Sequence, residues 1–543
     1  MQKQLLYQNY STSVLTGRQL LLSFDVEYRV DPNDPVRWVD AFVDTLADRE
    51  VSPTRHSLRG RRTIYTDRLM LKICLMAAVL AQNSSRQIED LCRHDIRFLW
   101  LLGSLAAPDH TTIARYHARI RSGLGGILMA MNHWLLQQGL ITSDHLFIDG
   151  TKIEAVSNRY TFVWKKAVMK HLERLLGQLP DLFLRMNDEL ASEAIQDDEI
   201  AFALEHPQET LEILRETITR VIHRQQISLV YGKGQRKHDL QRLLEEVERS
   251  LARVIRYEQQ IAVCGPHRNS FSKTDPDATF MRMKDDHMRN GQLKPAYNLT
   301  IGVNSEFILW VDLSQDRTDY ARLPLVLDAV EKIFGHPVHA VVADAGYDCT
   351  DNYRYCQDKA ILPYIKPQCY EAEKKKAYWT NPKNWKSMRY DPVKDAFHCL
   401  GGRRLDFQRI RNDQTRQGMR IEKRIYECTD CSGCTLKDRC TTSRGNRKIY
   451  WDRSLEEWRK VSQGLIQSPE GILLRLNRSI QAEGCFASLK SHRGRDRLRH
   501  VGIDKCLAEM QWEALGHNVR KLVRKLQRKD PRQYLHACQA AVA

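Results

Sequence analysis

Three acidic residues, far apart along the chain, stand where phosphoryl-transfer chemistry could use them. Asp149 follows an apolar stretch in FIDGT, Asp344 follows another in VVADAGY, and Glu483 lies among positive charges in RSIQAEGCFASLK. Sites that use two divalent ions need carboxylates that converge from separate elements, because the ions clamp the attacking and leaving oxygens. A single Asp-Gly pair is most often a turn. Two aspartates at predicted strand ends, with a glutamate on a basic helix, are more specific and predict a divalent-metal site.

Two basic residues flank Glu483 on the same predicted helix. Lys490 follows seven residues later and therefore shares its face. Arg478 precedes it by five residues, about 140° around a helix of 3.6 residues per turn. We therefore expect Lys490 to reach DNA held at Glu483, and Arg478 to do so only if the helix begins late or the side chain bends. The alternatives are that Lys490 is a solvated lysine and that Glu483 is an acid on the protein surface.

A second cluster of metal-binding residue types lies between Asp344 and Glu483. Cys428, Cys431, Cys434 and Cys440 follow one another in IYECTDCSGCTLKDRC, and four thiols so close suit a tetrahedral zinc ion. Cys399 is a fifth candidate that could replace one of them. An iron–sulfur cluster, a redox cluster and unpaired surface cysteines are the alternatives. No strand or helix pattern competes in this stretch, so we expect a structural insertion separate from the chemical site.

The N-terminal part of the chain reads as a series of helices. Apolar residues recur with helical spacing over 35–50, 65–82 and 84–103, and again after Asp109. Ser84 or Ser85 could cap one helix, and Asp109 another. The helix after Asp109 carries Arg115 and Arg119, which is compatible with a helix-turn-helix that contacts DNA. The alternative is a helical bundle with solvated basic faces.

The acids belong to a predicted α/β core with two insertions. YNLTIGVN and EFILWVDLS predict a β-hairpin, Leu323–Phe334 an amphipathic helix, and ILPYIKP a further strand. Heptad-like spacing within 165–262 predicts a helical hairpin. The predicted domains are an N-terminal helical, DNA-end-binding domain (1–140), the first part of the core (141–164 and 263–367), the helical hairpin (165–262), the Cys-rich insertion (368–454), the core helix with Glu483 (455–500) and a basic helical C-terminus (501–543).

Composition agrees with a nucleic-acid partner but does not establish one. The net charge is +17 over 543 residues, which suggests a polyanionic partner. Cys74, Cys92 and Cys506 stand singly in apolar runs, as reduced core thiols do. The longest apolar run, Leu69–Leu80, holds a lysine and is too short to span a bilayer. No signal-peptide pattern is present, so we expect a cytoplasmic protein without a disulfide framework.

The chain resembles bacterial insertion-sequence transposases of the DDE superfamily, and looks closest to the group numbered eleven-eighty-two. This resemblance implies an RNase H-like catalytic core, with Asp149, Asp344 and Glu483 as the catalytic acids and Lys490 as the lysine that follows them. Arg478 matches a nearby basic position, although Arg475 stands where related families have tyrosine. The motifs that carry the likeness cover most of the chain: SSRQIEDLCRHDIRFLWLLG, PDHTTIARYHARI, FIDGTKIEAVSNRYTFVWKK, KTDPDATFMRMK, GQLKPAYNLTIGV, ADAGYD and RSIQAEGCFASLK.

The hypothesis from the sequence is therefore a DNA transposase associated with the bacterial nucleoid. The three acids would bind two Mg²⁺ or Mn²⁺ ions, water would cut the transposon end, and the freed 3′-OH would attack target DNA. A homodimer would hold two ends, and the basic C-terminal helices would grip phosphate. A regulator that no longer transposes and a host nuclease are the alternatives. The residues expected to contact DNA are Arg115, Arg119, Arg478, Lys490, Arg493 and Arg495.

Overall fold

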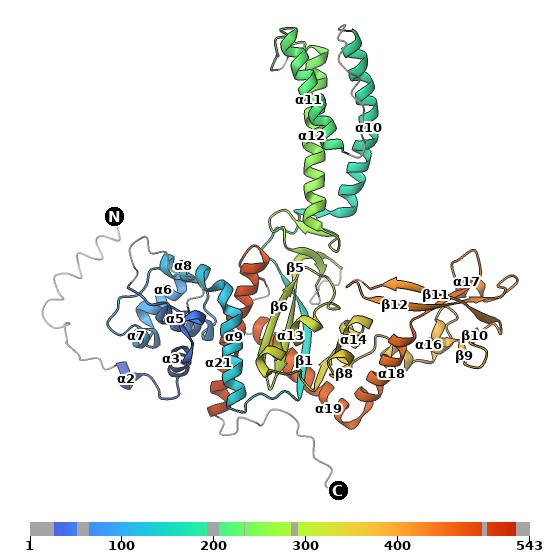
Figure 1. Cartoon of the computed structure of the whole chain (residues 1–543). Helices are drawn as coiled ribbons and strands as arrows, with labels where there is room; N and C mark the ends of the chain where they lie inside the picture. The colour runs from blue at the N-terminus through green and yellow to red at the C-terminus, as the bar shows by residue number, and fades with distance from the viewer. Residues whose placement is uncertain are drawn as a thin grey trace. The chain divides into compact units, whose positions relative to one another are not determined.

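The computed structural model describes most of the chain, which divides into two compact units. One unit comprises residues 1–140 and 511–534, and the other 141–510 and 535–543. Figure 1 labels the helices and strands of both. None of the described helices is long and apolar enough to cross a membrane. The described residues are 26–51, 64–192, 206–232, 234–283, 291–415, 417–490 and 497–527.

The first unit is helical, as its apolar periodicity predicts. In α5, nine of the thirteen residues are buried, and Cys74 and Cys92 are buried free thiols, as expected. The Asp109 carboxylate caps α8 by accepting the Thr111 N–H at 2.7 Å, and Ser84 occupies the N-cap position of α6. The helices are α2 (Val26–Arg29), α3 (Pro35–Thr45), α4 (Asp48–Val51), α5 (Asp67–Val79), α6 (Ser85–His94), α7 (Ile96–Leu102), α8 (His110–Ile120) and α9 (Leu124–Gln137).

The C-terminal helix α21 (Ile503–Gln527) corrects the expected phosphate grip. Arg520 points inward and donates to the Val79 carbonyl oxygen at 2.8 Å, while Lys525 is buried. The last carbonyls of a helix have no partner within it, and those at the end of α5 are bonded by Arg520 instead. The expected grip on phosphate is therefore wrong for these two residues. Arg528 and Lys529 lie outside the described residues.

The second unit contains a six-stranded mixed sheet in the order β4-β5-β1-β7-β8, with β6 paired to β5. The central strand β1 runs antiparallel to β5 and parallel to β7. The predicted hairpin is confirmed as β5 and β6. This mixed α/β arrangement fits an RNase H-like core. The strands are β1 (His145–Glu154), β4 (Thr279–Arg282), β5 (Leu293–Asn304), β6 (Phe307–Ser314), β7 (Ala340–Ala343) and β8 (Leu362–Ile365).

Helices contact most strands of this sheet. The predicted amphipathic helix is confirmed as α13, which contacts β5 and β6, while α18 contacts β8 and α19 contacts β7. A π-helical segment, Ser479–Glu483, follows α19 and contacts β1 and β5. The helices are α13 (Leu323–Phe334), α14 (Thr350–Asp358), α18 (Arg453–Gln467), α19 (Pro469–Arg478) and α20 (Gly484–Lys490).

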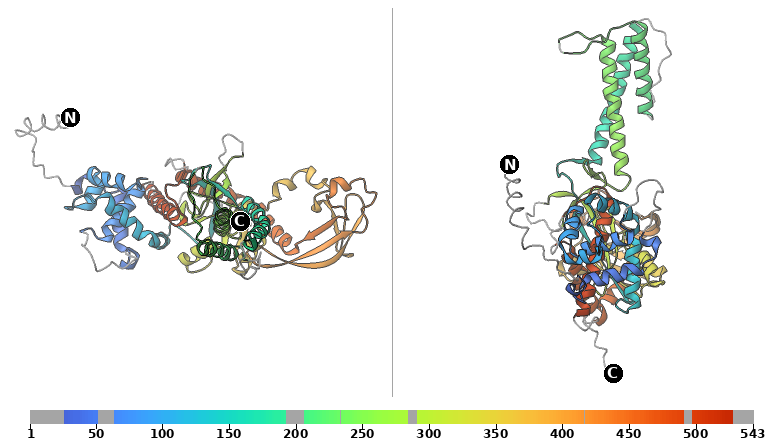
Figure 2. Two further views of the ribbon diagram at one scale, coloured as in Figure 1. Left: turned by 90° about the horizontal axis from the view of Figure 1, so that it is seen from above. Right: turned by 90° about the vertical axis from the view of Figure 1, so that its left-hand side faces the viewer.

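An inserted arm interrupts the sheet between β1 and β4. The expected pair of helices is present as α11 (Pro207–Arg224) and α12 (Asp239–Cys264), and their heptad positions are buried. A third helix, α10 (Lys165–Ser192), also contacts α12, so the arm is not the simple hairpin that was expected. Figures 1 and 2 show the three helices side by side. Strands β2 (Phe162–Trp164) and β3 (Ser270–Ser272) pair where the arm begins and ends.

The Cys-rich stretch is more regular than expected, because it contains a five-stranded antiparallel sheet in the order β13-β12-β11-β10-β9. The expectation that no strand pattern exists there is wrong. Most side chains of β11 are exposed, so no alternation of apolar and polar residues marks it. The elements are α15 (Tyr370–Glu373), α16 (Lys376–Trp379), β9 (Arg389–Asp391), β10 (Ala396–His398), β11 (Arg404–Gln414), β12 (Arg420–Cys428), α17 (Lys437–Cys440) and β13 (Lys448–Trp451).

Candidate active site

Asp149 lies on β1, and Asp344 directly follows the neighbouring parallel strand β7. Ile148 of β1 is in register with Ala343 of β7, so the two aspartates occupy the next position along each strand. Asp149 is only 5% exposed. Asp344 begins a short 3₁₀ turn and accepts the Gly346 N–H at 2.8 Å. The sheet register therefore places the two acids side by side.

β1 does not end at Asp149, as expected, but continues to Glu154. Gly150 is therefore a strand residue and not part of a turn. A methyl group on Gly150 would lie 2.7 Å from the Asp319 Oδ1 atom, and one on Gly346 would lie 3.1 Å from Asp319 Oδ2. A glycine within a strand often marks such a close approach. The glycines of the two motifs thus leave room for a third aspartate.

Asp319 is an acid that sequence reasoning missed. It lies in the connection between β6 and α13, where no apolar strand precedes it. Its Oδ1 atom accepts a hydrogen bond from the Asn298 amide at 2.6 Å and lies 3.6 Å from the Lys152 Nζ atom. The motif glycines indicate a close approach at this position, but nothing in the sequence says which side chain makes it.

The negative charges of all three aspartates affect the pKa of the Tyr347 phenol. Its pKa is raised well above the usual value, first because the side chain is buried and then because Asp319, Asp149 and Asp344 are negatively charged nearby. The tyrosine therefore stays neutral. Three carboxylates thus act on one buried phenol.

Arg478 is the cation that joins the aspartates to Glu483. Its Nη1 atom lies 2.8 Å from Asp149 Oδ2, and its Nη2 atom lies 3.6 Å from Glu483 Oε1. The glutamate side chain is 59% exposed and accepts a hydrogen bond from the Ser479 hydroxyl at 3.0 Å. Asp149 and Glu483, 334 positions apart, thus share one guanidinium group.

The expectation that Arg478 lies far around the helix from Glu483 is wrong, and the backbone explains why. The calculation assumed 3.6 residues per turn, but Ser479–Glu483 is π-helical. In a π-helix the hydrogen bonds run between residues five apart. Residues at that spacing therefore lie nearly above one another, which lets Arg478 and Glu483 meet.

Lys490 also points toward β1. Its Nζ atom donates a hydrogen bond to the Thr151 hydroxyl at 2.8 Å. Because side chains alternate along a strand, Thr151 lies on the same face of β1 as Asp149. The lysine therefore places its charge beside the acids.

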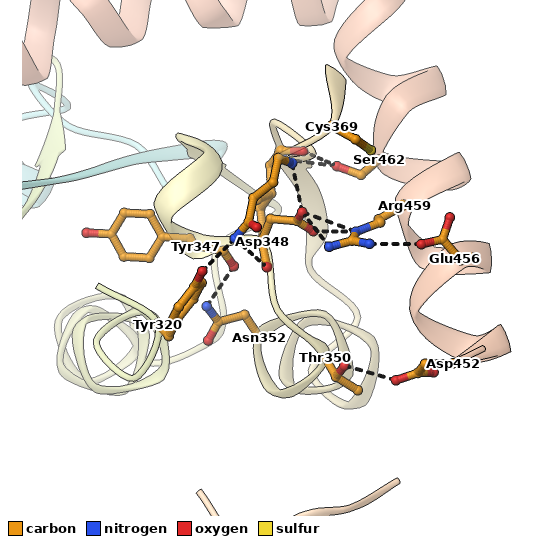
Figure 3. A network of polar contacts seen from close by, with 12 residues as sticks. Tyr320, Tyr347, Asp348, Thr350, Asn352, Cys369, Asp452, Glu456, Arg459 and Ser462 are labelled. Atoms are coloured by element: carbon orange, nitrogen blue, oxygen red, sulfur yellow. Dashed lines mark hydrogen bonds and ion pairs between the residues drawn. The ribbon is translucent and has the colours of Figure 1, made fainter. Parts of the chain in front are cut away.

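The loop that follows Asp344 is anchored by a buried ion pair, drawn in Figure 3. Arg459 of α18 donates to the Asp348 carboxylate at 3.0 and 2.9 Å, and the aspartate side chain has no exposed surface. The Gln368 N–H also donates to it at 2.8 Å. Burial lowers the pKa of Arg459, but its bonds to Asp348 and Glu456 raise it further. This pair fixes the loop against the helix pair that leads to Glu483.

The remaining predicted DNA contacts lie elsewhere. Arg115 is exposed on α8, whereas Arg119 is half-buried and forms an ion pair with Asp67. Arg493 and Arg495 lie outside the described residues. These positions, like the catalytic and metal-binding roles of the acids, stay predictions.

The three predicted acids are of a type that suits a divalent metal ion, but their carboxylate oxygens do not all lie within 4.8 Å of one another. Carboxylate oxygens are the ligands that Mg²⁺ prefers, and a guanidinium group already balances their charge. The described residues contain one group of three ligand atoms within 4.8 Å of one another, Glu89, Asp109 and His110. That group lies in the first unit, where Asp109 caps α8. Arg478 lies between Asp149 and Glu483. Two ions a few ångströms apart would need carboxylates on both sides of the pair of ions.

Two family models match the chain. A model described as a transposase domain of unknown function matches residues 24–119, and one described as a transposase DDE domain matches residues 398–523. These two matches support an insertion-sequence DDE transposase. The DDE match covers Glu483 and Lys490 but neither Asp149 nor Asp344, which the sheet register brings together independently. Searches of curated proteins and of solved structures gave no match for this transposase.

Proposed function

We propose that this transposase cuts double-stranded DNA at the ends of an insertion sequence and joins the 3′-OH ends to target DNA. The observation that carries the proposal is that Arg478 contacts both Asp149 and Glu483, while the sheet register puts Asp344 next to Asp149. Phosphoryl transfer with two metal ions requires acids that come from separate elements, and here one acid comes from a strand, one from the turn after a strand and one from a helix.

In this proposal Asp149, Asp344 and Glu483 hold Mg²⁺ or Mn²⁺. Such ions supply positive charge to the reacting phosphate and lower the pKa of bound water. Asp149 is nearly buried and sits on the central strand, so its position is fixed. Glu483 is largely exposed and can adjust to DNA. The pair thus combines a rigid ligand with an adaptable one.

Two basic residues have roles at the phosphate. Arg478 balances the carboxylates before ions bind, and it has to give up its bond to Asp149 when they do. Lys490, held by Thr151 beside Asp149, is placed to contact a phosphate oxygen of the DNA end. A lysine serves this role as a point charge.

Asp319 is a positioning residue in this proposal. It occupies the space left by the glycines of both acid motifs, accepts a hydrogen bond from Asn298 and pairs with the charge of Lys152. Its carboxylate is therefore already engaged by two side chains of the sheet. It would fix the spacing of β1 and the turn that follows β7.

The test uses purified protein, labelled DNA carrying the two ends that flank its gene, and a target plasmid. Alanine at Asp149, Asp344 or Glu483 should lower cleavage and joining by roughly a thousand-fold or more while binding of the ends is retained. Asp358→Ala, which removes an exposed surface pair with Arg354, is the matched control. Full cleavage by Asp344→Ala would refute the site.

The same assay separates the alternatives. A host nuclease would release cut DNA without joining it to plasmid. A regulator would bind the ends with no cleavage in any metal. Asp149 lies beside Asp344 and shares Arg478 with Glu483, which favours an enzyme over a regulator. Omission of Mg²⁺ and Mn²⁺ should abolish both cleavage and joining.

A further inference from the structure

A cleft rich in aromatic side chains lies between the five-stranded sheet and α18. Its volume is about 370 Å³, within the range of about 300–1,000 Å³ that is typical of pockets for small ligands. None of the acids of the proposed active site lines it. The aromatic residues along its walls are Trp379, Trp385, Tyr390, Phe397 and Trp451.

The core of the five-stranded sheet holds the rings on one side of the cleft. The ring of Trp451 lies with its centre 5.0 Å from that of Tyr390 and 5.5 Å from that of Phe397. Phe397 is buried in the apolar core of this sheet, whereas Tyr390 and Trp451 keep part of their surface exposed. The sheet therefore fixes aromatic surface at the cleft.

Trp379 is the most exposed of the five rings, with 46% of its surface open to solvent. Its orientation is nevertheless fixed. The indole N–H donates to the Glu373 carbonyl oxygen at 2.7 Å, and the ring of Tyr378 packs edge-on at 5.3 Å. An exposed ring that is already held in one orientation loses little freedom when a flat ligand stacks on it.

The acids on the α18 side of the cleft already have cationic partners. Glu456 accepts from the Lys386 Nζ atom at 2.6 Å, and both side chains are largely buried. Glu457 pairs with Arg453 at 2.9 Å. A cationic ligand would therefore have to displace a lysine or an arginine to reach a carboxylate in this wall, which disfavours such a ligand.

The segment around the cleft is strongly basic. Residues 386–451 contain sixteen lysines and arginines against eight aspartates and glutamates, an excess of eight where the whole chain has +17. Lys460 of α18 also lines the cleft. It is exposed, and among the described residues it has no ion-pair partner. This charge favours a polyanionic ligand.

Helix α18 supports both the cleft and the proposed active site. Glu456 accepts from Arg459 at 2.8 Å, and Arg459 in turn holds Asp348 in the loop that follows Asp344, as Figure 3 shows. A continuous series of ion pairs thus runs from Lys386 at the cleft to the loop of the second predicted acid.

We propose that the cleft binds an unpaired nucleobase of single-stranded DNA, which stacks on Trp379 while Lys460 contacts a neighbouring phosphate. Aromatic side chains beside positive charge bind single strands without reading their sequence. A base within a duplex is already stacked on both faces and cannot use the cleft. The inference rests on the proposed function, because cutting and joining of strands can leave unpaired nucleotides at DNA ends.

The test measures binding of a fluorescently labelled oligothymidylate to the full chain by anisotropy, with a chelator present so that no strand is cut. Trp379→Ala should weaken the affinity about tenfold, whereas Trp379→Phe, which keeps a ring, should lose much less. Tyr231→Ala removes an exposed ring from the inserted arm and should bind like the wild type. Equal affinities of Trp379→Ala and the wild type would overturn the proposal.

Other ligands and variants separate stacking from other effects. Trp379→Ala should leave the affinity for a fully paired duplex unchanged, and an equal loss with duplex would refute stacking. Lys460→Gln should reduce the slope of log affinity against log salt by about 0.7 for the single strand, and an unchanged slope would contradict its contact with phosphate. Tighter binding of a trimethyl-lysine peptide than of the oligonucleotide would assign the cleft to a cationic partner and overturn the proposal.

Failure of the proposed function and failure of this inference are distinguishable. Asp344→Ala, which should not cut DNA, should bind the oligothymidylate like the wild type. A chain that cuts and joins DNA ends but binds the single strand equally well with and without Trp379 would refute only the cleft.

A second measurement uses the unsubstituted chain and so does not depend on the folding of a variant. An oligonucleotide that contains iodouracil is irradiated in complex with the protein, and cross-linked peptides are identified by mass spectrometry. Peptides that contain Trp379 or Tyr390 should carry the cross-link. Cross-links confined to other parts of the chain would refute the proposed site.

Discussion

Replacement of Arg478 by alanine should destabilise the metal-free protein and strengthen metal binding at the same time. The arginine pairs with Asp149 at 2.8 Å, where the aspartate side chain is 7% and the arginine side chain 19% exposed. Removal of one partner of a buried pair costs about 3–5 kcal/mol, because the other charge is left unpaired. A bound divalent ion would neutralise Asp149 in the variant, so only a hydrogen bond worth about 1 kcal/mol is then lost.

The two losses define a thermodynamic cycle. The variant loses about 3 kcal/mol or more without the ion and about 1 kcal/mol with it. The difference, at least about 2 kcal/mol, must appear as tighter binding of the ion by the variant. This corresponds to roughly thirtyfold in dissociation constant. Arg478→Lys, which keeps the charge, should give a smaller change in both quantities.

Hydrogen exchange of peptides from β1 reports the local free energy of opening, and calorimetric titration with Mn²⁺ reports affinity. Arg453→Ala is the control, because its exposed pair with Glu457 is worth at most about 1 kcal/mol. Weaker Mn²⁺ binding by Arg478→Ala would refute the proposal that the guanidinium occupies the place of the ions. Equal destabilisation with and without Mn²⁺ would do the same.

Two further predictions concern the supports of the site. Asp348→Ala should lower the free energy of local opening around α18 by about 3–5 kcal/mol, since it strands Arg459, and Glu457→Ala on the exposed side of α18 should change it by less than about 1 kcal/mol; similar values from hydrogen exchange would contradict the anchoring role. Lys490→Gln should weaken binding of DNA ends and reduce the slope of log affinity against log salt by about one, and an unchanged slope would show that this lysine does not contact phosphate.

The strand elements around the acids could be predicted because they are buried and apolar. FIDGT and VVADAGY each contain an apolar run that leads into an acid, and the hairpin of β5 and β6 has a short polar turn. The exact end of β1 was not predictable, because Asp-Gly usually marks a turn. Only the approach of Asp319 shows why Gly150 continues a strand.

Other features depend on tertiary structure that local patterns do not encode. The π-helical segment moves Arg478 toward Glu483, and a calculation with 3.6 residues per turn could not anticipate it. Strand β11 is exposed at most positions, so its sequence shows no alternation of apolar and polar residues. Arg520 lies in a basic run that looks solvated, yet it bonds to carbonyl oxygens at the end of α5.

The arrangement of charges explains how this site could fold before it binds metal. Asp149, Asp319 and Asp344 surround one buried tyrosine, and like charges at such a site disfavour the folded state unless cations balance them. Lys152 balances Asp319, and Arg478 balances Asp149. Asp344 is held by the Gly346 N–H in a loop that the Asp348–Arg459 pair anchors. The sheet and these cations thus position the aspartates before any metal binds. The π-helical segment places Glu483 near Arg478, the same arginine that pairs with Asp149 and that divalent ions would displace.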